Sequence, residues 1–412
     1  MRKQVLLLGV VSGAALACSG TAQAKAGDPV EVADGVTIDP IISGVLRYEG
    51  VDQDNAGLNA DALTLGMEAG FEVKASGFSF LAEAEGTLAI IDDYNDTISG
   101  NNGYIGNEPY SIVADPENVE LNRLQVGYAG KFGSLTVGRQ TIALGNHRFV
   151  GHVGWRQNIQ TFDAVRGVVK FGPAYVDATY SNSQRTIFGM DAGAKTAFDG
   201  DHVFVNAGAK VAGIDLTAFA YLLDYDLGEA APSSQTYGAI ASGKLPIKGP
   251  VSVSFVASYA KQGDYKGHTA PYSADYINGE LGVGFKGLKL TGGYELLGSA
   301  NGIGFSTPMA TLHKFNGFAD VFLNTPGAGL QDYYGTLAYA FTGVKALPGL
   351  NASLTYHKFE SDVGGADYGE EWDATLGFKL GGYPFLVKYA NYNADTVGTD
   401  TEKLWIQVSF AY

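Results

Sequence analysis

Cysteine is almost absent from this chain, which has a single one, Cys18. A fold held together by disulfide bridges is therefore excluded, because one thiol has no partner within the chain. A lipid anchor on Cys18 is the alternative use of this residue. Lipoprotein signals place leucine three residues before the cysteine, and this sequence has Ala15 there. We therefore expect Cys18 to lie in a targeting segment.

Basic residues and long apolar runs are also scarce. The chain has 27 Lys and Arg against 43 Asp and Glu, for a net charge of −16. Such an acidic chain is a poor partner for nucleic acid. Beyond the N-terminus no apolar run approaches the roughly 18 residues that a membrane helix requires. A chain of this kind can cross a bilayer only as a closed barrel, because lipid satisfies no backbone hydrogen bonds.

The N-terminus has the parts of a secretory signal peptide. Arg2 and Lys3 precede an apolar centre at Val5 to Ala17, and the small residues Ala22 and Ala24 follow it. Small residues at these two positions predict cleavage after Ala24. The mature chain then leaves the cytoplasm.

Glycine and aromatic residues are abundant, with 57 Gly, 24 Tyr and 22 Phe. Many segments alternate strictly between apolar and polar residues, as β-strands with two unlike faces do. In one such segment Val251, Phe255 and Tyr259 share a face, and Ser254 and Ser258 point the opposite way. A soluble all-β protein with one solvated face is the simpler interpretation.

Strand and loop lengths favour a membrane barrel over that interpretation. The strands are near ten residues long, enough to cross a bilayer when tilted. Tight turns such as Ala75–Gly77 alternate with long polar stretches, as outer-membrane barrels require. These long stretches are Asp92 to Val119, Gly145 to Gln160, Asn182 to Asp201 and Lys261 to Ser273.

The C-terminal segment, Leu404 to Tyr412, alternates to its end and finishes on an aromatic residue. This ending resembles the signal that the barrel-assembly machinery of the outer membrane recognises. We therefore predict that this machinery is a partner, together with outer-membrane lipid and lipopolysaccharide.

Strand parity predicts eighteen strands. Nineteen segments are apolar enough, but an odd number is unusual for a bacterial barrel. We assign strand directions forward from the N-terminus and backward from the C-terminus. The two assignments disagree only over Leu312 to Leu323, a segment that does not alternate. There Phe315, Phe318 and Phe322 fall at helical spacing. We predict one long inward loop over about Gly298 to Leu330, with a short helix and a constriction made by these three phenylalanines.

A barrel of 16 to 18 strands encloses an aqueous channel, whose inward face decides what passes. Alternation predicts pore-lining charges at Arg47, Arg123, Arg166, Glu83 and Glu85. Their order along the chain suggests a basic wall facing an acidic one. Separate solvation of each charge is the alternative.

Arg139 shares parity with Leu135 and Val137, which should face lipid. A charge near the bilayer midplane would cost roughly 2–4 kcal/mol. We favour a β-bulge at Gly138 that turns Arg139 inward. The alternative is that Arg139 lies above the apolar band.

Two blocks resemble the alginate export family of outer-membrane porins. The first has Arg148-Phe-Val-Gly, Gly154-Trp-Arg-Gln-Asn158 and Gln160-Thr-Phe-Asp-Ala164, and the second has Thr311-Leu-His-Lys-Phe-Asn-Gly-Phe-Ala-Asp320 and Gly329-Leu-Gln-Asp332. The resemblance implies an 18-stranded barrel and an arginine-lined pore for an anionic polysaccharide.

A ladder of Arg148, Arg156 and Arg166, with Lys314 on the inner loop, would suit carboxylates, because guanidinium forks match them. Alternatively, these arginines pair with local acids such as Asp163. The strongly negative chain also fits a dedicated polyanion exporter poorly.

We therefore predict an outer-membrane porin that passively conducts polar solutes, anionic or saccharide, without a cofactor or a metal. A barrel-embedded enzyme or surface-binding protein is the alternative, and calcium binding by the loop Asp92 to Asp96 stays open. The predicted divisions are a signal peptide over 1–24, a periplasmic segment over 25–40 and one barrel over 41–412.

Overall fold

The computed structural model describes residues 28–98, 109–229, 231–245, 247, 249–266 and 270–412. The predicted signal peptide lies outside these residues and stays a prediction. In this part of the chain no helix has the length and apolar character needed to span a bilayer.

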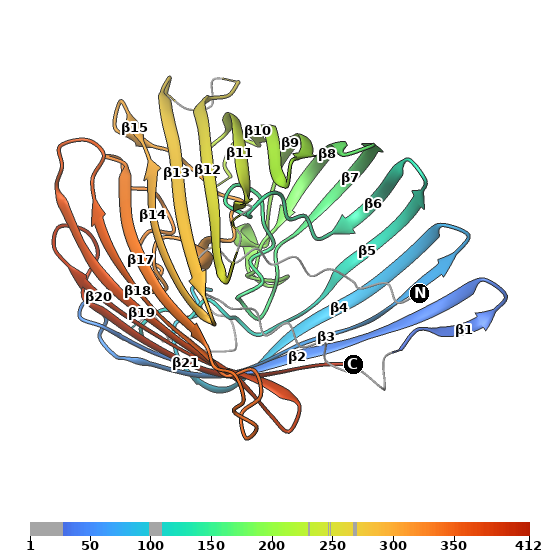
Figure 1. The fold of residues 1–412 in the computed structure, drawn as a ribbon, viewed down its shortest axis with the longest axis horizontal. Helices are drawn as coiled ribbons and strands as arrows, with labels where there is room; N and C mark the ends of the chain where they lie inside the picture. The colour runs from blue at the N-terminus through green and yellow to red at the C-terminus, as the bar shows by residue number, and fades with distance from the viewer. Residues whose placement is uncertain (1–27, 99–108, 230, 246, 248, 267–269) are drawn as a thin grey trace.

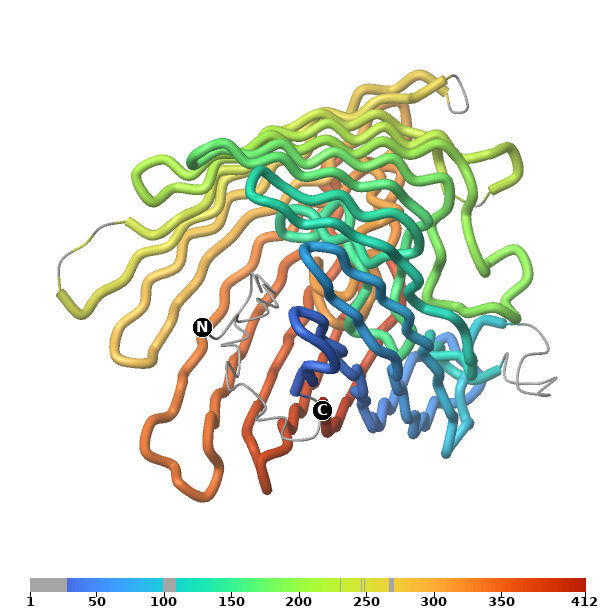
Figure 2. Tube along the Cα trace, turned by 90° about the vertical axis from the view of Figure 1, so that its right-hand side faces the viewer, coloured from blue at the N-terminus to red at the C-terminus, as the bar shows by residue number. Residues whose placement is uncertain are grey.

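One antiparallel sheet contains nineteen strands of the described residues, and it closes because β2 pairs with both β3 and β21. The first strand, β1 (Val30–Ala33), pairs with the start of β2 only, so eighteen strands form the wall, as parity predicted. Figure 2 shows the blue and red ends of the wall meeting. The wall strands are β2 (Val36–Gln53), β3 (Ala60–Ala75), β4 (Phe78–Asp93), β5 (Asn118–Gly130), β6 (Gly133–Gln140), β7 (Thr161–Phe171), β8 (Ala174–Arg185), β9 (Ala197–Val211), β10 (Ile214–Tyr225), β11 (Ser234–Leu245), β12 (Val251–Asp264), β13 (Ser273–Phe285), β14 (Leu288–Leu297), β17 (Leu330–Ala340), β18 (Asn351–Glu360), β19 (Asp367–Leu380), β20 (Tyr383–Ala394) and β21 (Thr401–Ala411) (Figure 1).

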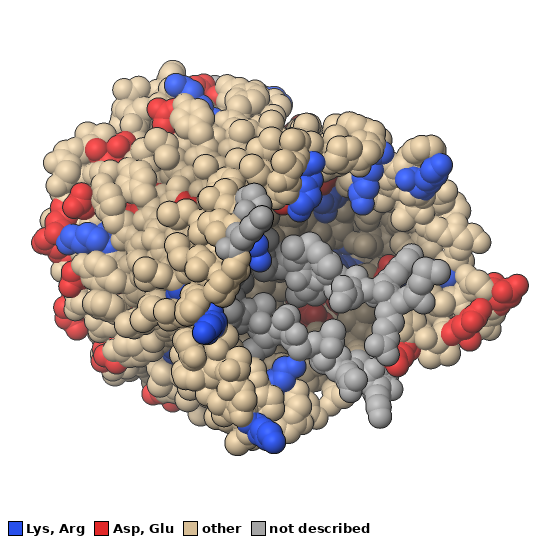
Figure 3. All heavy atoms as spheres, viewed as in Figure 1, with Lys and Arg blue, Asp and Glu red and all other residues tan. Residues whose placement is uncertain are grey.

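The outer face of the wall is apolar. Val126, Leu281 and Leu290 are each more than half exposed. In Figure 3 uncharged atoms cover most of the visible outer surface beside the hollow. Exposed apolar side chains in alternation with inward polar ones are the pattern of a lipid-facing barrel. The soluble all-β alternative is therefore set aside.

One boundary differs from the predicted one, and a second agrees with it. β2 begins at Val36, before the predicted barrel start at 41, because pairing with β3 extends to the Val36–Ala75 pair. The long loop is confirmed, since β14 ends at Leu297 and β17 begins at Leu330. It carries the short strands β15 (Ser299–Ala300) and β16 (Ile303–Gly304).

The predicted helix over Phe315 to Phe322 is wrong. The loop forms only a 3-10 turn, η3 (Leu312–Lys314); a similar turn, η2 (Gly193–Lys195), lies between β8 and β9. Asn316, Gly317 and Asp320 have φ angles of 57°, 85° and 62°. Left-handed residues interrupt a right-handed helix, so helical spacing of the phenylalanines does not produce one.

The predicted bulge at Gly138 is also wrong. β6 pairs with β5 and with β7 in unbroken register through Arg139. Arg139 therefore keeps the outward parity of Val137. The register shift in this region lies between β7 and β8, at Asp163 and Ala164.

The main apolar core lies inside the barrel. Phe149 from the β6–β7 loop and Phe305 from the β14–β17 loop pack against Phe219 and Tyr276 on the inner wall. A wall that is apolar on its inner face here can hold loops in place by burying aromatic surface. The two loops therefore fill part of the lumen, and the remaining space holds the candidate site.

Candidate functional site

Two of the cavities inside the barrel adjoin the inward loops. The turn-side cavity, of about 440 Å³, is lined by wall residues such as Phe385 and Ser409 near the short turns. The loop-side cavity, of about 630 Å³, is lined by residues such as Pro232 and Tyr272 near the long loops. His313 lines both cavities. The loops thus form a partition across the lumen, and its charged residues are the candidate site.

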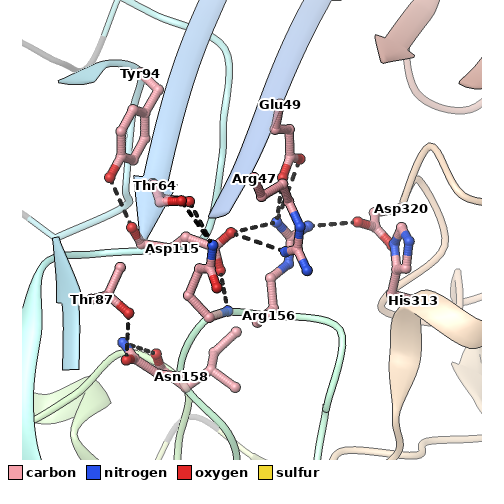
Figure 4. A network of polar contacts seen from close by, with 12 residues as sticks. Arg47, Glu49, Thr64, Thr87, Tyr94, Asp115, Arg156, Asn158, His313 and Asp320 are labelled. Carbon is pink, nitrogen blue, oxygen red and sulfur yellow. Dashed lines mark hydrogen bonds and ion pairs between the residues drawn. The ribbon is translucent and has the colours of Figure 1, made fainter. Parts of the chain in front are cut away.

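Arg156 is the centre of this partition (Figure 4). Its guanidinium donates to Glu49 of β2 at 3.1 Å and to Asp320 of the other loop at 2.8 Å. Asp115, from the β4–β5 loop, lies 3.8 Å away. Burial lowers the pKa of Arg156, but the three carboxylates outweigh burial and raise that pKa above its ordinary value. Arg156 therefore stays charged and joins three inward loops to the wall.

Arg47 of β2 shares Asp115 with Arg156. The Nη1–Oδ2 distance is 3.5 Å, and the guanidinium lies 4.1 Å from the centre of the Trp155 ring. The other carboxylate oxygen of Asp115 accepts the backbone N–H of Gln157 at 2.8 Å. A fold tolerates buried charged side chains when each of them has partners of this kind. Arg47 is thus a support for the Trp155 segment as well as an inward cation.

Arg148, in the β6–β7 loop, joins the β14–β17 loop to the wall strand β14. It donates to Glu295 of β14 at 3.0 Å and to Asn316 at 2.9 Å. Asn316 in turn donates to Glu295 at 2.8 Å and to Asp332 at 3.2 Å. The positive φ of Asn316 turns its side chain into this network, which makes the loop rigid at the partition.

The remaining predicted wall charges form pairs with neighbours. Arg123 of β5 bonds to Glu83 of the adjacent strand β4, and Arg166 bonds to Asp177 at 2.6 Å. A basic wall opposite an acidic wall is therefore wrong for Glu83 and Arg123, which sit side by side. Glu85 accepts the backbone N–H of Ile159 at 3.2 Å. These acids hold arginines and loop backbone instead of standing alone in solvent.

The predicted loop residues divide into two groups. Lys314, Phe315 and Phe318 line the turn-side cavity. Phe322 packs in the enclosed core instead, with its ring 4.6 Å from that of Phe359. Lys314 donates to the carbonyl of Asn146, and burial lowers its pKa to about 8.

Lys388 and His313 are partition residues that the sequence interpretation missed. Lys388 Nζ lies 3.4 Å from the Phe318 ring centre and 4.0 Å from that of Trp155. It donates to His313 Nε2 at 2.6 Å, while His313 Nδ1 lies 2.8 Å from Asp320. The available signal was parity, since Lys388 lies between Val387 and Tyr389 in an alternating segment.

The His313 ring is neutral in this arrangement. It stacks on Trp155 at 4.6 Å and is 5% exposed. Burial holds its pKa well below the ordinary value, although Asp320 acts in the opposite direction. A neutral imidazole has one donor and one acceptor nitrogen. Here Nδ1 donates to Asp320 and Nε2 accepts from Lys388.

Within the described residues no three His, Cys, Asp or Glu side chains gather as a metal ion would need. In the loop Asp92 to Asp96, Asn95 and Asp96 accept the backbone N–H groups of Thr97 and Ile98. Those bonds are the ones that a tight polar turn makes.

Residues 79–201 match the alginate export family, which confirms the resemblance stated for the first block. The second block, from Thr311 to Asp332, lies outside this match. Among curated proteins, none matches the chain by sequence.

Solved outer-membrane channels share the whole fold. Pseudomonas aeruginosa OpdK, crystallised with vanillate, is 14% identical with a TM-score of 0.70, over 91% of this chain and 98% of that one. Acinetobacter baumannii OccAB4 is 13% identical with a TM-score of 0.69, over the same shares. The chain is an outer-membrane β-barrel with the channel fold. For P. aeruginosa OpdL the identity is 15% and the TM-score 0.66, over 92% and 99%.

Proposed function

We propose that this barrel is a passive channel for small polar solutes, with anionic and saccharide solutes as the preferred classes. The observation that carries the proposal is the pair of cavities on either side of the partition. Each cavity is large enough for a small molecule but not for a folded domain. A solute that passes from one to the other crosses the membrane.

The lining of the turn-side cavity supports these solute classes. Trp155 and Phe315 offer flat apolar faces, while Thr355, Asn351 and Gln407 offer hydroxyl and amide groups. Hydrogen-bonding groups around an aromatic surface suit a sugar ring. Two lysines, 314 and 388, add positive charge for a carboxylate. The vanillate in the OpdK crystal is also a small ring with a carboxylate, which agrees with this choice.

The arginines take a narrower role in the proposal. Arg47, Arg148 and Arg156 are buried, and each has at least one carboxylate partner. A long polyanion would have to compete with those partners at every step, so the pairing favours small solutes over a polysaccharide. Arg166 is the most open of the predicted ladder, and its side chain is a quarter exposed.

Planar-bilayer recording tests the channel. The purified barrel should show ohmic steps, and complete absence of conductance would reject the proposal. In a salt gradient the reversal potential then measures the preference for anions. Arg166→Gln should shift that potential toward cations, because it leaves Asp177 without its cation.

We also propose that the last strand directs assembly. In β21, Leu404 and Ile406 face lipid, and Tyr412 donates its backbone N–H to Ile42 at 2.8 Å. Deleting Phe410 to Tyr412 should lower the amount of folded barrel in the outer membrane. An unchanged yield would argue against recognition of this end by the assembly machinery.

A further inference from the structure

His313 lies where the two cavities adjoin. It is one residue common to both linings, and its ring lies between the rings of Trp155, at 4.6 Å, and Phe318, at 5.5 Å. The path from one cavity to the other therefore meets this ring.

The ring is held by two hydrogen bonds of different strength. Nδ1 donates to the carboxylate of Asp320, which Arg156 also binds. Nε2 is a neutral acceptor for the ammonium of Lys388. In the described part of the chain no ion pair joins Lys388 to a carboxylate. Lys388 thus has a neutral acceptor where a carboxylate would bind more tightly, because donor and acceptor would then both be charged.

Aromatic faces surround this ammonium. Besides Phe318 and Trp155, the Trp405 ring centre lies 5.3 Å from Lys388 Nζ. Such faces stabilise a cation without neutralising its charge. The lysine therefore keeps its capacity to bind an anion while it is almost fully buried.

The backbone on either side of His313 is fixed, so the side chain is the part that can move. On the N-terminal side Thr311 donates its backbone N–H to the carbonyl of His147 at 3.0 Å, and on the C-terminal side Glu371 accepts the N–H of Ala319 at 2.7 Å. Asp320 is bound by Arg156 from the other loop. Rotation of one imidazole requires none of these bonds to break except its own two.

We propose that His313 narrows the channel and that the carboxylate of a small solute widens it by taking the place of His313 Nε2 on Lys388. This inference rests on the channel function proposed above and names the contact that selects the solute. The displaced ring turns into one of the adjoining cavities. A neutral solute cannot replace His313 on Lys388 in this way, so carboxylates pass in preference.

Two variants test the two parts of the proposal in planar bilayers. His313→Ala should join the cavities and raise the conductance in simple salt by at least about twofold, since pore width sets ion flow. His313→Asn, which is smaller but still polar, should give an intermediate increase. His152→Ala is the matched control, because His152 lies on the other loop and in neither cavity lining.

Lys388→Met should abolish the selective effect of carboxylates. Benzoate added to one side should raise the conductance of the unmodified barrel, because it displaces the His313 ring, and benzyl alcohol should not. In Lys388→Met, benzoate should bind about tenfold or more weakly, as loss of a charge-assisted bond implies. The shift of the heat-modified band on SDS gels confirms that each variant is folded.

The outcomes separate this inference from the channel proposal. Conductance of His313→Ala equal to that of the unmodified barrel overturns His313 as the constriction. A benzoate-induced rise in conductance that Lys388→Met retains overturns Lys388 as the contact, and the absence of any rise in the unmodified barrel overturns the exchange itself. A silent unmodified barrel with a conducting His313→Ala variant supports the constriction while rejecting passive conduction by the native chain.

Discussion

Arg139 on β6 and Asp163 on β7 form a two-bonded ion pair on the outer face of the barrel, with N–O distances of 2.8 and 2.9 Å. Val165 follows Asp163 by two residues on β7, toward the short turns, and it pairs with Tyr180, whose hydroxyl donates to Asp201. The ion pair therefore lies farther from the short turns than Val165 and Tyr180 do, near the height of Asp201, at the outer limit of the apolar band. Of the two explanations for Arg139, its position above that band is the one that the structure supports.

The Arg139–Asp163 pair should contribute little to stability. At the membrane interface an unpaired arginine costs only about 0–1 kcal/mol. Asp163→Ala should therefore lower the free energy of unfolding by about 1 kcal/mol, and Arg139→Leu by less. Urea unfolding in lipid vesicles measures both. A loss above about 3 kcal/mol in Asp163→Ala would place the pair at the midplane after all.

Arg156 should be the most sensitive of the arginines. Arg156→Met leaves Glu49, Asp115 and Asp320 buried together, and breaking a buried pair typically costs about 3–5 kcal/mol. Arg166→Met is the control, because its half-open pair with Asp177 should cost much less. Thermal unfolding followed by SDS-gel mobility compares the two. Equal losses would mean that Arg156 does not brace the partition.

Lys314 should make the channel sensitive to mildly alkaline pH. Burial lowers the pKa of Lys314 to about 8 from an ordinary 10.5, so its charge is lost as pH rises through about 8. The anion preference from reversal potentials should fall over pH 7 to 9, an effect that Lys314→Met abolishes.

The same pKa sets the sign of the stability effect. Between pH 8 and 10.5 the unfolded chain binds more protons at this residue than the folded chain does. The contribution of Lys314 to the free energy of unfolding therefore rises with pH in that window and is lowest below it. A fall across the window, absent in Lys314→Met, would contradict the assigned burial.

Phe322 and Phe315 should differ in what they support. Phe322→Ala removes a core ring packed against Phe359 and should cost about 3–5 kcal/mol of stability. Phe315→Ala removes a cavity-lining ring and should change the effect of a solute on the current more than it changes stability. Chemical unfolding and bilayer recording on both variants compare the effects. The reverse assignment would place Phe322 in the pore.

The wall of the barrel was predictable from sequence, while the partition was largely not. Period-two alternation depends on neighbouring residues, so it revealed eighteen strands and the inward parity of Arg47 and Arg166. The partners of Arg156 are Glu49 and Asp320, which lie 107 and 164 residues away in the chain. No local pattern encodes such distant pairs.

The loops also lack the regularity that makes strands readable. The phenylalanines of the second loop suggested a helix, but left-handed Asn316 and Asp320 set its path. Lys388 follows the period-two alternation of its strand, so strand parity was sufficient to predict that it faces inward. The match to the alginate export family covers Arg123 to Arg166 and ends before His313 and Lys388.

The aromatic cluster enclosed by the wall bears on the order of assembly. Phe149 and Phe305 come from loops, and the residues they meet, Phe219 and Tyr276, lie on the inner side of strands β10 and β13. That inner side becomes a curved surface only once neighbouring strands have paired. We therefore expect the loops to find their binding surface late, so that insertion of the wall precedes the tightening of the channel. A newly inserted barrel should then pass through a stage that is wider inside than the finished one.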